Sequence, residues 1–185
     1  MEEQQPHYNP MQAIKRRFFA MRNGVVADVL RRAGSPYRVI FGLNLPQIVD
    51  IASSTGPSRE LAEDLWANST TRESVLAAPM LMPRDTFTID DARRWVETVP
   101  DREAADYLCH RLLRHMPYAM SLADELSLAA GMKCYTGVRL AVNLVYAHPT
   151  EAMTIAGRVL AAGHDPQVER LASQIVTEVN ELGLA

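Results

Sequence analysis

The sequence predicts an all-α protein, and three observations lead to that class. Helix start and stop signals recur along the chain, in the order that successive short helices require. Only residues 38–43 (RVIFGL) have the composition of a strand, and their place between two helical segments favours a turn. From residue 58 onward, caps or turn boundaries return at Ser58, Thr88, Tyr118 and Thr150, at spacings of 30, 30 and 32 residues.

Residues 1–57 are expected to form N-terminal capping helices. Three helical segments bounded by Asn, Gly or Pro follow one another there: MQAIKRRFFAM, VVADVLRRA and QIVDIASST. Asn44 caps the third segment, and Pro46 stands in its first turn, where the missing backbone N–H would have had no partner anyway. The pair Gly56-Pro57 ends this segment.

Each of the four later intervals holds two helical segments separated by a small turn. Each segment carries one apolar stripe that it cannot bury alone, so stacking of successive pairs is the physical solution. The repeat length of about 30 residues indicates an α-solenoid, a superhelix of antiparallel helix pairs. Because the residue pattern of tetratricopeptide repeats is not met, we favour a HEAT-like solenoid. We therefore expect one α-solenoid domain over residues 1–185, with capping helices in 1–57 and about four helix-pair repeats in 58–185.

Composition excludes several classes of protein. With 48% hydrophobic residues, 185 residues can bury a real core. The apolar runs fall short of the roughly 18 residues that cross a bilayer, and the N-terminus MEEQQPHYNP is polar, so we expect a soluble cytoplasmic protein with no membrane partner. Cys109 and Cys134 are too few for a disulfide scaffold; buried reduced thiols are expected, with a single bridge as the alternative.

No chemistry that needs a cofactor or a metal is indicated. Motifs of nucleotide-binding loops, zinc proteases and serine hydrolases are missing from the sequence. His110 and His115 are five residues apart, which is not the spacing of a helical metal pair. We therefore expect no metal and no cofactor.

Charge is distributed unevenly along the chain. Residues 11–38 contain seven Lys and Arg residues and one Asp, a local charge of +6, whereas the whole chain has a formal charge of −3. A basic end on an acidic body can form a phosphate-binding edge. The alternative is a solvated helix face without a partner.

The stretch VPDREAADYLCHRLLRHMP, residues 99–117, brings Asp106, Cys109 and His110 within about one helical turn. On a helix over 101–115, one apolar stripe forms: Ala105, Leu108, Cys109, Leu112 and Met116. Cys109 is therefore expected in the core and not as a nucleophile. Asp106 lies on the other side, with Arg102 four residues before and His110 four residues after it, which indicates a solvated face of weak ion pairs more than a catalytic dyad.

Four segments in succession carry a family resemblance: FFAMRNGVVADVLRRAGSPYRVIFGLNLPQIVDIA, RELAEDLWANSTTRESVLAAPML, DARRWVETVPDREAADYLCHRLL and GVRLAVNLV. Over about residues 14–147, their order resembles the DNA alkylation repair family of HEAT-repeat DNA glycosylases. No single segment decides this resemblance; the succession does.

The resemblance implies a concave groove, lined by the second helices of the pairs, that cradles duplex DNA. It also implies hydrolytic removal of cationic alkylpurines such as 3-methyladenine and 7-methylguanine. Asp106 matches the family's carboxylate, which would stabilise the positive charge that grows on the sugar. Arg139 matches a basic residue of the following inner helix, and Arg139, Lys133 and Arg102 are expected to contact phosphates.

An alternative from another class of function stays open. Active members carry aromatic side chains just before the carboxylate, whereas this chain has PDRE at residues 100–103. A non-catalytic scaffold of the same descent would instead bind a protein or peptide partner in its groove.

Overall fold

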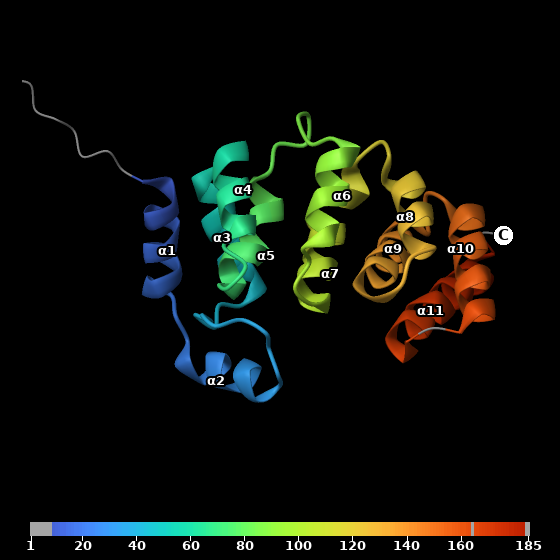
Figure 1. The fold of residues 1–185 in the computed structure, drawn as a ribbon, viewed down its shortest axis with the longest axis horizontal. Coiled ribbons are helices and arrows are strands. Elements are labelled where there is room, and N and C mark those ends of the chain that lie inside the picture. Colours follow the sequence, from blue (N-terminus) through green and yellow to red (C-terminus); the bar gives the residue numbers. More distant parts are fainter. Residues whose placement is uncertain (1–8, 164, 184–185) are drawn as a thin grey trace, which may run out of the picture. The chain divides into compact units, whose positions relative to one another are not determined.

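The computed structural model describes residues 9–163 and 165–183, and its regular elements there are helices (Figure 1). They are α1 (Pro10–Ala20), α2 (Gly24–Arg32), α3 (Leu45–Thr55), α4 (Arg59–Ala67), α5 (Arg72–Leu81), α6 (Ile89–Glu97), α7 (Arg102–Arg111), the 3₁₀ helix η1 (Leu113–His115), α8 (Ala119–Ser127), α9 (Gly131–Leu144), α10 (Pro149–Ala162) and α11 (Pro166–Leu182). Among the described residues, strand-like pairing is limited to a bridge between Val39 and Thr71. The predicted all-α class is confirmed.

The helices form two compact units, Met1–Pro83 and Arg84–Ala185. The boundary falls between α5 and α6 and not after residue 57, where the capping helices were expected to end. The organisation of the whole chain as one domain stays a prediction. Of the described helices, none combines the length and the apolar character needed to span a bilayer.

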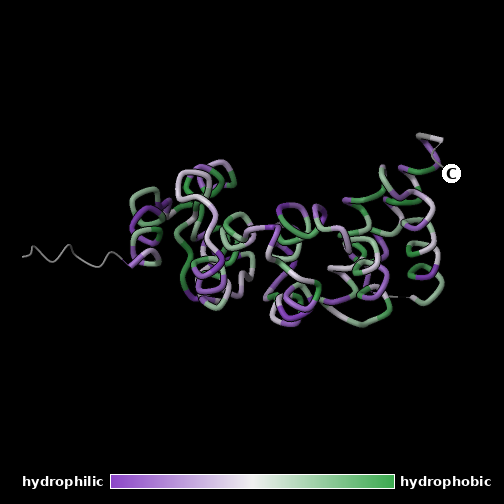
Figure 2. The backbone as a smooth tube through the Cα atoms, turned by 90° about the horizontal axis from the view of Figure 1, so that it is seen from above, coloured by the Kyte–Doolittle hydropathy of each residue, from purple (hydrophilic) through white to green (hydrophobic). Residues whose placement is uncertain are grey.

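Each of the four predicted intervals holds two helices in succession, α4 and α5, α6 and α7, α8 and α9, and α10 and α11. Of these, α4 packs on α5, α8 on α9 and α10 on α11. Ser58 and Thr88 cap α4 and α6 with their side-chain oxygens, because each accepts a backbone N–H of the first turn. Asn44 and Gln47 form a reciprocal capping box at α3. Figure 2 shows polar and apolar residues alternating along the helices, as expected where each helix buries one stripe.

In the first unit, a buried carboxylate fixes the loop before α3. Glu73 of α5 is fully buried and accepts backbone N–H groups from Phe41 at 3.0 Å, Gly42 at 2.9 Å and Leu43 at 3.3 Å. Arg72, also buried, lies 3.0 Å from the same carboxylate and donates to the Leu43 carbonyl at 3.1 Å. The segment predicted as a turn is therefore an ordered loop fastened to α5.

Gly42 places this loop directly against the start of α2. Its φ is +81°, and a Cβ added there would lie 2.2 Å from the Asn23 carbonyl oxygen. The Asn23 amide in turn donates to the Phe41 carbonyl at 2.8 Å. Only glycine allows both the left-handed backbone and this close approach.

The second unit is organised around α9, which contacts α7, α8, α10 and α11. At Gly137, α9 lies close to α8. A Cβ at Gly137 would lie 2.7 Å from Ser127 N and 2.9 Å from Ala123 O, both backbone atoms of α8. Two helix backbones can come this close only where one of them lacks a side chain.

We expect Glu73→Gln to lower the free energy of unfolding by about 3 kcal/mol or more, because it leaves the buried Arg72 charge unbalanced. Urea unfolding followed by circular dichroism measures this loss. Glu60→Gln, at an exposed position in the first turn of α4, is the matched control and should change stability by less than about 0.5 kcal/mol. Equal effects of the two substitutions would contradict the role of Glu73.

Gly137→Ala should destabilise the protein by about 1–3 kcal/mol, since the added methyl group meets backbone atoms that cannot move aside. Gly157→Ala in α10, where nothing lies within 4 Å of the added Cβ, should instead stabilise it by about 0.5–1 kcal/mol. The difference in melting temperature between the two variants tests the close contact, and a stable Gly137→Ala variant would argue against it.

Candidate functional site

Asp106 projects from the middle of α7 toward α9. The Tyr135 hydroxyl of α9 donates to Asp106 Oδ1 at 3.0 Å, and Arg139 Nε lies 3.0 Å from the same oxygen. The Asp106 side chain keeps 33% of its surface exposed. Both contacts fall on Oδ1, and in the described part of the chain no hydrogen bond reaches Oδ2. The carboxylate is thus fixed by one oxygen and open at the other.

The Arg139 guanidinium contains a buried hydrogen-bond donor that is not satisfied. Its Nε is buried and makes no hydrogen bond, although Asp106 Oδ1 lies only 3.0 Å away, so the N–H does not point at that oxygen. A buried donor without an acceptor costs about 1–3 kcal/mol. Proteins seldom keep such a group outside a functional or strained site.

The environment of Asp106 favours its protonated form more than water does. Burial raises the pKa of Asp106 above its ordinary value of 3.8, while the Arg139 charge and the Tyr135 hydrogen bond oppose that shift. Burial, together with the Asp106 charge, also raises the pKa of Tyr135, so its hydroxyl stays protonated and able to donate.

The expected ion pairs along α7 do not form. Arg102 pairs with Asp165, just before α11, at 2.9 Å, and His110 Nδ1 lies 3.4 Å from Asn143 Oδ1 of α9. Arg102 and His110 are exposed, as the prediction of a solvated face requires, but α9 packs beside Asp106 and the partners come from other elements and not from α7. Arg102 still adjoins the site, since its guanidinium carbon lies 5.6 Å from the centre of the Tyr135 ring.

Lys133 is not brought to Asp106. It forms an ion pair with Glu97 of α6 and lines a pocket of about 360 Å³ together with Arg93 and Glu125. The three residues predicted to contact phosphates, Arg139, Lys133 and Arg102, are thus each paired with a carboxylate. Their role on phosphates stays a prediction.

The prediction that Cys109 belongs to the core is confirmed. It is fully buried with Ala105, Leu108 and Leu112, and its Sγ donates to the Thr136 carbonyl at 3.4 Å. Burial raises the pKa of Cys109 far above that of a free thiol. Cys134 is also buried, and neither thiol is in a disulfide, so the alternative of a single disulfide bridge was wrong.

A second cationic group was missed in the sequence. Arg84, Arg111 and Arg114 gather with His115 around η1, and none of these arginines forms an ion pair with a described carboxylate. The sequence signal is HRLLRH at residues 110–115, in a stretch from 107 to 123 that contains no acidic residue. Arg84 precedes this stretch by more than twenty residues, so only the fold reveals that it belongs to the group.

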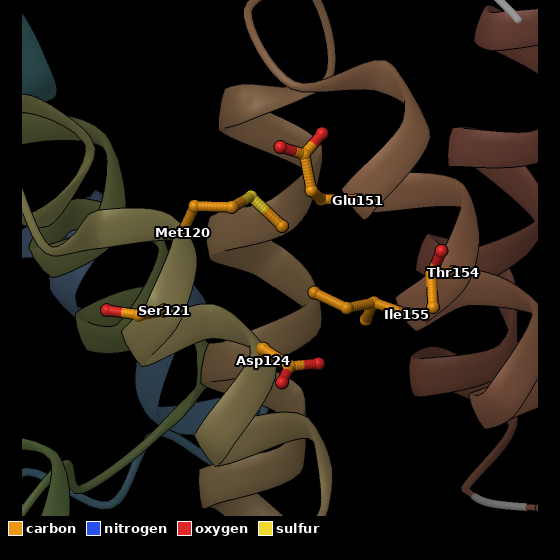
Figure 3. A pocket seen from close by; sticks show the side chains of 6 residues that line it. All are labelled: Met120, Ser121, Asp124, Glu151, Thr154 and Ile155. Atoms are coloured by element: carbon orange, nitrogen blue, oxygen red, sulfur yellow. The ribbon is translucent and has the colours of Figure 1, made fainter.

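A pocket between α8 and α10 is chemically different (Figure 3). It has a volume of about 300 Å³, and Met120 points from α8 toward Ile155 of α10 across it. Asp124 and Glu151 line it as carboxylates, and Asp124 is paired with Arg158 at 2.6 Å. Among the described residues, no group of three His, Cys, Asp or Glu side chains is placed to hold a metal ion.

The comparisons with known proteins bear on both the fold and this site. The family model described as "DNA alkylation repair enzyme" matches residues 14–130. The chain belongs to the DNA alkylation repair family. The matched range contains Asp106 and ends just before α9, which carries Tyr135 and Arg139. The resemblance seen in the sequence is therefore confirmed.

A solved structure places this DNA alkylation repair family member among helical-repeat folds. It is described as "a new family of proteins related to the HEAT-like repeat DNA glycosylases with affinity for branched DNA structures". The TM-score is 0.78 at 14% sequence identity, over 91% of this chain and 75% of that one. The predicted HEAT-like fold is confirmed. No curated protein matches the sequence significantly.

The pKa of Asp106 yields a stability test for this DNA alkylation repair family member. Because the folded-state pKa lies above the unfolded one, the native protein loses stability as the pH rises through the range above 3.8. Asp106→Asn removes this dependence. Its melting temperature should therefore rise relative to that of the parent between acid and neutral pH; a fall would mean that the Arg139 ion pair is structural.

Proposed function

We propose that this protein binds duplex DNA and hydrolyses the N-glycosidic bond of cationic alkylpurines, with Asp106 as the carboxylate at the reacting sugar. The observation that carries the proposal is the geometry of Asp106, which is anchored through Oδ1 by two residues of α9 and open at Oδ2. Membership of the DNA alkylation repair family supports this substrate class.

Hydrolysis of the N-glycosidic bond of a cationic alkylpurine needs few protein groups. A purine that carries an alkyl group on a ring nitrogen is positively charged, so it leaves as a neutral base once the bond to the sugar breaks. The barrier lies in the positive charge that then develops on the sugar, and an adjacent carboxylate stabilises it. Water adds its oxygen to the anomeric carbon and gives up a proton, which Oδ2 of Asp106 can accept.

The partners of Asp106 supply its orientation. The Tyr135 hydroxyl and the Arg139 guanidinium both act on Oδ1, so the carboxylate cannot turn freely. A preoriented charge costs no reorganisation when the transition state forms. The unpartnered Arg139 Nε lies beside it and could gain an acceptor when a phosphate or sugar oxygen arrives.

A second candidate function is DNA binding without hydrolysis. Arg102 stands one turn before Asp106, where active members carry an aromatic side chain, and it is paired with Asp165 over the Tyr135 ring. A base or sugar would have to displace this arginine to stack there. The affinity described for the solved relative supports branched DNA as the ligand of this candidate. A protein or peptide partner stays a prediction, because no comparison names one.

The release of free base from methylated duplex DNA, resolved by chromatography, tests the proposal. We expect the parent to release alkylpurines and Asp106→Asn to be about 10²–10³-fold slower, as for the loss of one electrostatic contact to a transition state. Asp50→Asn, the same change at an exposed position in α3, should keep the parental rate.

The other outcomes separate the candidates. DNA binding without base release from the parent would favour the second candidate. Release that survives in Asp106→Asn would contradict the role of Asp106. Neither binding nor release would remove both DNA functions and leave the protein or peptide partner as the remaining hypothesis.

A further inference from the structure

Three arginines from two parts of the chain meet at the end of α7. Arg84, in the segment before α6, directs Nη2 toward the carbonyl of Arg111, the last residue of α7, at 3.5 Å. Arg114 of η1 donates from Nε to His115 Nε2 at 3.3 Å. The charges of Arg84 and Arg114 both act on His115, and Arg111 is the last residue of α7 beside them. These four residues are here called the η1 cluster.

The η1 cluster has no balancing negative charge. None of its arginines forms an ion pair with a carboxylate among residues 9–163 and 165–183. Elsewhere in the same unit, arginines such as Arg93 and Arg158 are paired with acids at 2.7 Å and 2.6 Å. Unpaired cations that repel one another cost stability, and this cost suggests that an anion from outside compensates for it.

The end of α7 explains only part of this arrangement. The carbonyls of a last helical turn carry about half a unit of negative charge, which is enough to attract one cation but not to balance three. The pKa shifts of the two nearby histidines also indicate an excess of positive charge. Burial and the nearby arginines lower the pKa of both His110 and His115, and no carboxylate acts against these shifts.

The η1 cluster adjoins the Asp106 site along α7. Arg111 lies about 140° further round α7 than Asp106, so the two sites are linked through His110, four residues after Asp106 on the same side of the helix. This is about 6 Å along the helix axis, close to two base-pair steps of a duplex at about 3.4 Å each. His110 stands between them, and the charges of Arg111, Arg114 and Arg139 all act on it. A DNA strand with its reacting sugar at Asp106 would therefore bring a flanking phosphate to η1.

We infer that the η1 cluster, and not the ion-paired Lys133 and Arg102, binds the phosphodiester backbone of the DNA that flanks the nucleotide at Asp106. This inference rests on the proposed function. Guanidinium groups suit the task, because their N–H groups match phosphate oxygens in pairs. His115 would add a neutral imidazole beside the phosphate, held by Arg114.

The test is a salt series of DNA binding, measured by fluorescence anisotropy with a labelled duplex. In the variant Arg84→Gln, Arg111→Gln, Arg114→Gln, the slope of log K against log salt should become shallower by about 2–3, and binding at about 100 mM salt should weaken roughly tenfold or more. The control Arg31→Gln, Arg32→Gln, Arg38→Gln removes the same charge from the first unit and should weaken binding less. Arg114→Gln alone shows the effect with the least risk to folding.

The outcomes distinguish this inference from the proposed function. Equal losses in the two triple variants, or a greater loss in the control, would overturn the inference while leaving DNA binding intact. A second arm titrates His115 by NMR with inorganic phosphate, which should raise its pKa by neutralising the arginines. If the parent binds no DNA but phosphate raises this pKa, the proposed function fails and the anion site stands. If phosphate leaves the pKa unchanged and DNA binding does not depend on the η1 cluster, the inference is wrong.

Discussion

The second unit depends on the contact between the backbones of α8 and α9 at Gly137. This contact sets the depth at which α9 lies between its neighbours, and α9 carries both residues that hold Asp106, two positions on either side of the glycine. A side chain at position 137 would push α9 away from α8 and displace Tyr135 and Arg139 together. The geometry of the candidate site is therefore a consequence of helix packing on the opposite side of α9.

The candidate site contains two features that lower the stability of the fold. Asp106 is placed where burial disfavours its charge, and Arg139 holds a buried N–H that finds no acceptor. By contrast, the buried charges of the first unit are fully used, since Glu73 accepts three backbone amides beside Arg72. The charged pair of the first unit is buried and fully hydrogen-bonded, whereas the pair at Asp106 is partly exposed and keeps free hydrogen-bonding positions.

Features that depend only on residues close together in the sequence could be predicted from it. Caps such as Asn44, Ser58 and Thr88, and the apolar stripe that contains Cys109, follow from local hydrogen bonding and helical periodicity, and they were predicted correctly. Partners across helices were not predictable in this way. Arg102 and His110 have suitable neighbours on their own helix but take partners from other elements, and Glu73 gives no sign in the sequence that it anchors a loop thirty residues earlier. Such pairings are decided by packing distance and not by spacing along the chain.

The two thiols bear on how this protein can be studied. Cys109 and Cys134 lie in the core, each donates to a backbone carbonyl, and burial raises the pKa of both. A protonated thiol without solvent access reacts poorly with maleimides and with oxidised partners. One cysteine introduced on the surface would therefore be modified selectively in the natural background, so a fluorophore or a crosslinker can be attached beside η1 without first removing the native cysteines.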